Sequence, residues 1–144
     1  MAAINYGSLG RALAEELPDL LAKRDQVVNE MVVLQQGSTG EVLQWATEKG
    51  KKAAGLDRFI LLARLWYRDL LALTYQAAPG QLVNQDRLAD LVSQQEQLTS
   101  ALILERLEAL SAMQRQLRAN LNIELTLNNF SLQWRREGPA AVFK

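Results

Sequence analysis

The chain has 144 residues, enough for one ordinary domain with a real hydrophobic core. Hydrophobic residues make up 49% and charged residues 22%, and 16 basic residues balance 16 acidic ones, which excludes a disordered tail and a strongly basic nucleic-acid arm. There is no cysteine and no histidine, so disulfides, thiolate nucleophiles, histidine-containing catalytic triads and the commonest zinc sites are excluded.

The sequence predicts an all-α fold, a bundle of about six to seven helices. Good helix formers dominate the second half, and no glycine or proline occurs from Gln81 to Glu137. The dipeptides that mark β-hairpins, Asn-Gly and Asp-Gly, do not occur in the chain. Helices are therefore expected throughout, separated by short connections.

The first helices are expected to be short and to be separated by proline and glycine. Residues 8–17 form the first, and Pro18, which needs no backbone N–H in a first turn, is expected to open a second helix that ends at Gly37. Ser38 and Glu41 have the spacing of a capping box. A third helix is therefore predicted to begin there.

Four further helices are expected in the rest of the chain. The fourth, over residues 56–78, is apolar on nearly every side, which is typical of a helix at the centre of a bundle. Asn84 is expected to cap a fifth helix, Thr99 or Ser100 a sixth, and Asn122 a seventh.

Few residues point to chemistry. The chain has no phosphate-binding loop of the type G-x-x-x-x-G-K-[ST] and no metal motif, so we expect no catalytic, cofactor-binding or metal-binding residues and no enzyme activity. Arg68 and Asp69 are ionisable residues inside the most apolar helix, and must pair with each other or face a partner. No signal peptide and no membrane span is evident, which favours a cytoplasmic protein.

Four segments resemble the C-terminal region of a replication family. The run from Leu65 to Leu73, Leu-Trp-Tyr-Arg-Asp-Leu-Leu-Ala-Leu, resembles the central collar helix of the delta-prime subunits of bacterial DNA polymerase III clamp loaders. Residues 82–88 and 116–125 follow in the order typical of that family, including its Asn-x-Asn turn. Residues 7–13 are similar to the entry to the last helix of the family's lid domain.

The resemblance implies a domain organisation and a function. Residues 1–37 would be the end of an AAA+ lid-like helical segment, and residues 38–144 the C-terminal helical collar domain. The collar is a non-catalytic scaffold that packs with the delta and tau/gamma subunits so that the complex can load the sliding clamp during DNA replication. The lid arginine that contacts phosphates in ATP-binding relatives corresponds to Gly10 here, which fits a subunit type that does not hydrolyse ATP.

The resemblance also implies partners and contact residues. No cofactor, membrane or small-molecule substrate is expected, and DNA is contacted only indirectly through the complex. Two other functions remain open, a generic helical protein–protein adaptor and a helical nucleic-acid-binding module, whose affinity would fall steeply with salt. Five residues are candidates for contacts with other subunits, with core packing or helix capping as the alternative for each: Arg68, Asp69, Asn120, Asn122 and Trp134.

Overall fold

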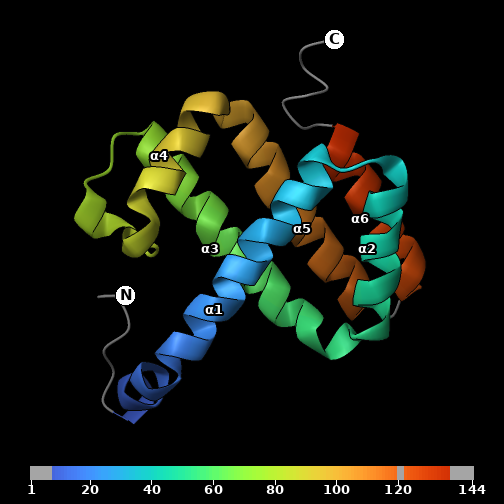
Figure 1. Cartoon of the computed structure of the whole chain (residues 1–144), viewed down its shortest axis with the longest axis horizontal. Coiled ribbons are helices and arrows are strands. Elements are labelled where there is room, and N and C mark those ends of the chain that lie inside the picture. The colour runs from blue at the N-terminus through green and yellow to red at the C-terminus, as the bar shows by residue number, and fades with distance from the viewer. Residues whose placement is uncertain (1–7, 120–121, 137–144) are drawn as a thin grey trace.

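The computed structural model describes residues 8–119 and 122–136. Within these ranges the chain forms six α-helices and three single-turn 3₁₀ helices, without strands, so the predicted all-α bundle is confirmed (Figure 1). The α-helices are α1 (Ser8–Gln36), α2 (Thr39–Lys51), α3 (Leu56–Thr74), α4 (Leu88–Gln97), α5 (Ser100–Arg118) and α6 (Ile123–Arg136). The 3₁₀ helices are η1 (Ala53–Gly55), η2 (Pro79–Gln81) and η3 (Gln85–Arg87).

Helix α1 continues through Pro18, so the predicted break between the first two helices is wrong. A proline inside a helix removes one N–H donor and crowds the carbonyl four residues earlier, at a cost of roughly 3 kcal/mol. Pro18 is exposed, whereas Val27, Met31 and Leu34, further along the same helix, are buried in the core. Tertiary packing of this apolar face offsets the cost of the proline.

Three helices begin at the caps that the sequence predicted. At α2, the N–H of Glu41 donates to Ser38 Oγ at 3.2 Å, and the N–H of Ser38 donates to Glu41 Oε1 at 2.9 Å, which completes the capping box. Thr99 Oγ1 at α5 and Asn122 Oδ1 at α6 each accept the backbone N–H three residues later, at 3.1 and 2.9 Å. These starts are set by local hydrogen bonds.

Helix α3 lies at the centre of the bundle, against α1, α4 and α5 (Figure 1). Phe59, Ile60, Trp66 and Leu70 of this helix are almost fully buried, as its apolar pattern predicted. No helix in the described ranges is both long enough and apolar enough to cross a membrane.

Helix α6 packs against α2 and completes the core with aromatic side chains. Phe130 lies 6.1 Å from Trp45 of α2 and 5.3 Å from Trp134, measured between ring centroids. Trp134 in turn meets Tyr67 of α3 edge to face, at 5.2 Å and 83°. The aromatic cluster therefore joins α2, α3 and α6, which are distant in sequence.

Candidate subunit interface

Asp69, one of the five predicted contact residues, lies inside the chain with 0% of its surface exposed. Its Oδ1 accepts the backbone N–H of Val83 at 3.0 Å, and its Oδ2 accepts the backbone N–H and the side-chain amide of Asn84 at 2.7 and 2.8 Å. Arg68 Nη1 lies 3.3 Å from Asp69 Oδ1, and the arginine side chain is 54% exposed. The carboxylate therefore fastens the connection between α3 and α4 onto α3.

Asn84 does not cap a helix, which corrects the prediction. Helix α4 begins only at Leu88, and the Asn84 side chain makes no capping bond. Its amide donates to Asp69 instead, and its Oδ1 accepts from Arg24 Nη1 at 3.4 Å. A buried amide takes the partners that surround it in the folded chain, and here these come from α1 and α3.

Two arginines and two aspartates tie α1 to the same connection, and we call these four residues the α1 latch: Arg24, Asp25, Asp86 and Arg87. The buried Arg24 donates to both oxygens of Asp86, at 2.7 and 2.8 Å, and Arg87 donates to Asp25 at 2.6 Å. The hydrogen bond from Arg24 lowers the pKa of Asp86. Burial alone would lower the pKa of Arg24, but its bonds to Asp86 and Asp25 raise it. Both charges are thereby stabilised.

The remaining predicted contact residues occupy different environments. Asn122 is exposed and caps α6, whereas Trp134 is 1% exposed and belongs to the core. Asn120 lies outside the described residues. Arg68 and Asn122 thus present side chains to solvent, while Asp69 and Trp134 are covered by the chain itself, and the role of these residues in contacts with other subunits stays a prediction.

Arg106 is a buried charge that the sequence reasoning missed. Its side chain is 0% exposed, and Nη1 donates to Gln35 Oε1 at 3.0 Å and to the Tyr67 hydroxyl at 2.7 Å. The guanidinium lies 4.5 Å from the ring of Trp134, while its Nε and Nη2 have no partner in the described part of the chain. Burial raises the pKa of Tyr67, although Arg106 acts in the opposite direction. A sequence signal exists, because Arg106 follows the buried Ile103 by three residues and so shares its face.

The largest hollow of the described surface lies where α1 crosses α3, and we call it the α1–α3 groove. It has a volume of about 1170 Å³ and extends from the end of α2 to the connection before α4. Its apolar part is leucine-rich, and Leu61 at its centre is 56% exposed.

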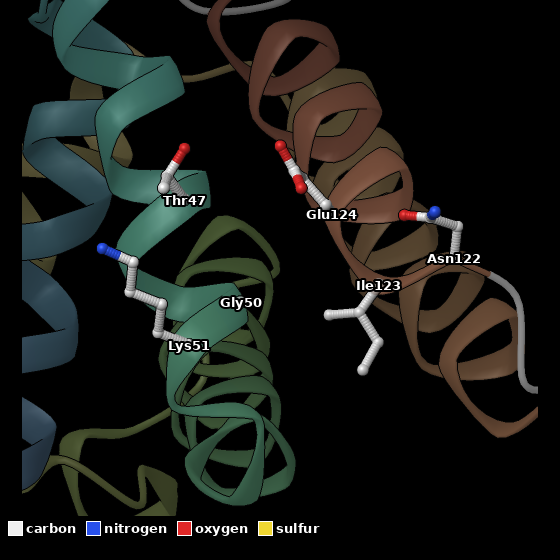
Figure 2. A pocket seen from close by; sticks show the side chains of 6 residues that line it. All are labelled: Thr47, Gly50, Lys51, Asn122, Ile123 and Glu124. Carbon is white, nitrogen blue, oxygen red and sulfur yellow. The ribbon is translucent and has the colours of Figure 1, made fainter.

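A smaller hollow of about 540 Å³ separates the end of α2 from the start of α6 (Figure 2). Figure 2 shows residues of α2 on one side and residues of α6 on the other, with an open gap between them. Asn122 lies at its rim, beside Ile123, which is partly exposed. The lining residues are Thr47, Gly50, Lys51, Asn122, Ile123 and Glu124. Neither hollow holds a cluster of three or more potential metal ligands among the described residues.

Comparison with protein families identifies the chain. The family model described as DNA polymerase III, delta subunit, C terminal, matches residues 18–136. The chain belongs to this family. No curated protein and no solved structure matches the chain.

The matched range includes the whole of α2 to α6 and most of α1. The coarser part of the sequence prediction was a C-terminal domain from a clamp loader, and at this level the prediction is confirmed. The C-terminal domain of this DNA polymerase III subunit is a scaffold in clamp loading, which agrees with a bundle that is built around packing and internal ion pairs.

Proposed function

We propose that the chain is the collar domain of a delta-prime type clamp-loader subunit. In this role it is a non-catalytic, cytoplasmic scaffold that packs with delta and tau/gamma subunits while the complex places the sliding clamp on DNA. The observation that carries the proposal is the family match over residues 18–136. The delta-prime assignment is supported by the resemblance of residues 65–73 and 116–125.

The surface of α6 supports a role in assembly. Leu125 and Leu132 are both exposed, and their spacing of seven residues places them on one face of the helix. The opposite face of α6 is in the core, so the helix is apolar on two sides. An apolar stripe of this kind is typical of a surface that a partner covers. Arg68 and Asn122 are proposed as polar contacts near such interfaces.

The division of the chain at residue 37 is also a proposal. Residues 1–37 are assigned to the end of a lid-like segment and residues 38–144 to the collar. Helix α1 crosses the residue at which the family match begins, and its buried residues Val27 and Leu34 join the core. We therefore propose that α1 connects the two parts as one continuous rod.

Native mass spectrometry of the chain mixed with delta and tau/gamma subunits from the same organism tests the proposal. We expect a defined hetero-oligomer that contains one copy of this chain. The double variant Leu125→Glu and Leu132→Glu should lose assembly while its far-UV circular dichroism is unchanged. Gln133→Glu, an exposed change on the same helix beside the stripe, should assemble normally.

Two results would contradict the proposal. A chain that stays monomeric while the other subunits assemble with one another would favour an unrelated helical adaptor. Direct binding to primed DNA in the absence of other subunits, with an affinity that falls steeply with salt, would favour the nucleic-acid-binding alternative.

A further inference from the structure

The α1–α3 groove has the size of a helix seat. Its volume of about 1170 Å³ exceeds the roughly 300–1,000 Å³ typical of small-molecule pockets. Along α1 it is lined from Leu17 to Glu30, which corresponds to about 20 Å of helix. A segment of nearly four helical turns would fill this length, so a protein helix suits the groove better than a small molecule.

Leucines form both walls of the groove. On α1 they recur at spacings of three and four residues, and on α3 they lie around the exposed Leu61. Two such ridges on crossing helices leave a furrow into which the side chains of a third helix can interdigitate. The leucines of the two walls are Leu17, Leu20, Leu21, Leu61, Leu62 and Leu65.

One end of the groove carries positive charge that the chain does not neutralise. Lys52 and Arg58 line this end, are exposed, and form no ion pair with any described residue. Nearby Lys49 is already paired with Glu30, at 2.7 Å. Asp57 is the single acidic lining residue that remains beside the two cations, so a positive excess is left.

The opposite end differs in charge. Asp86 lines it and is neutralised by the α1 latch, at 2.7 Å from Arg24. The connection that carries Asp86 is anchored at Asp69, eleven residues and therefore about 16 Å along α3 from Arg58. The groove thus has an apolar centre and one basic end.

We propose that the α1–α3 groove binds an amphipathic helix of a partner protein, with a leucine stripe against the groove and acidic residues against Lys52 and Arg58. The carboxyl end of a helix is its partly negative end, so the partner helix runs with this end toward the two cations. The inference goes beyond the collar function, because it names a surface and the chemistry of its occupant whichever partner supplies the helix.

Three labelled peptides of about 18 residues test the proposal by fluorescence anisotropy with the whole chain, in about 150 mM salt. The first has leucines at helical spacing and glutamates in its last turn, the second has lysines in place of these glutamates, and the third has the leucines of the first in scrambled order. We expect the first to bind about tenfold more tightly than the second, and the third not to saturate.

Variants of the chain then locate the site. Leu61→Glu should abolish binding of the first peptide, and the pair Lys52→Glu with Arg58→Glu should reverse the preference toward the lysine peptide. Leu104→Glu is the matched control, because Leu104 is a similarly exposed leucine on α5, 49% exposed, outside the groove. It should leave the affinity unchanged. Circular dichroism and thermal unfolding confirm that each variant is folded.

Equal affinity for the glutamate and lysine peptides, or binding that survives Leu61→Glu, would overturn the proposal. Self-association that Leu61→Glu abolishes, without peptide binding, would assign the groove to a second copy of the chain and overturn it as well. Failure of the peptides to bind does not affect the mass spectrometry of the mixed subunits, so the two proposals fail separately.

Discussion

At the scale of single residues, the charges buried in this bundle hold connections in place. Asp69 receives three N–H groups from Val83 and Asn84, two consecutive residues of the α3–α4 connection. Arg106 donates to α1 and α3 from the middle of α5. Each of these polar side chains joins segments that are far apart in the sequence, and each does so where water is excluded, so that its hydrogen bonds are hard to replace.

Replacement of Asp69 with alanine should destabilise the fold by about 3 kcal/mol, because it leaves three buried donors without an acceptor. Urea denaturation followed by circular dichroism measures the change. Glu108→Ala removes a carboxylate from an exposed ion pair with Arg115 and should cost less than about 1 kcal/mol. Similar losses in the two variants would show that the Asp69 bonds do not stabilise the connection.

Acid should release the α1 latch. The pKa of Asp86 is lowered in the folded chain by its hydrogen bond from Arg24, so its contribution to stability is complete above the unfolded value of about 3.9 and is lost as the pH falls through the lower folded value. Asp86→Asn should therefore lower the urea midpoint at about pH 7, and the difference from the parent chain should shrink toward about pH 3.

The control for this pH series is Glu105→Gln, which changes an exposed carboxylate on α5 that has no ion pair with a described residue. It should leave the urea midpoint nearly unchanged across the same range. A difference between the Asp86 variant and the parent chain that persists or grows in acid would exclude the latch as its cause.

At the scale of helices and turns, two glycines should respond to alanine in opposite directions. A Cβ at Gly37 would lie 2.6 Å from the carbonyl oxygen of Val33, closer than the 3.0 Å that real Cβ atoms respect, and the Gly37 carbonyl also accepts from Arg135 Nε at 2.7 Å. Gly37→Ala should cost roughly 1–3 kcal/mol. At Gly50, inside α2, the nearest atom is Leu127 Cδ1 at 3.8 Å, and Gly50→Ala should stabilise by roughly 0.5–1 kcal/mol. Thermal unfolding decides between them, and a shift of the same sign in both would refute this prediction.

The helix caps show what could be predicted from the sequence. The Ser38 cap was predicted correctly because its donor and acceptor lie three residues apart, within reach of a local pattern. Asn84 was mispredicted because its partner Arg24 lies sixty residues earlier in the chain. Pro18 was mispredicted because packing further along α1 outweighed a local breaker. The α1–α3 groove could not be predicted at all, since periodicity marks apolar residues but does not show which face stays uncovered.

At the scale of the whole molecule, α1 and α6 share one core although they are at opposite ends of the described chain. Leu34 of α1 and Leu127 of α6 are both fully buried in the same cluster. Such a core should unfold as one cooperative unit. The continuous core also explains why the bundle presents its remaining apolar groups, such as Leu61 and Leu125, at the surface.

Leu34→Ala should therefore destabilise the entire bundle by about 2–5 kcal/mol and speed hydrogen exchange in α6 as well as in α1. Hydrogen exchange resolved by mass spectrometry measures this. Val33→Ala, at a partly exposed neighbour, should cost less than about 1 kcal/mol and leave α6 protected. Faster exchange confined to α1 would favour a true domain boundary at residue 37 instead.

The packing of α6 against α2 has a consequence for biosynthesis. The ribosome completes α2 some eighty residues before α6, so at about 5–20 residues per second several seconds pass before Phe130 and Trp134 can cover Trp45. During this interval the growing chain has an apolar surface that only its final helix can bury. A trigger for chaperone binding is thus built into the order of the helices, and a message truncated before α6 should yield a product that is degraded rather than assembled.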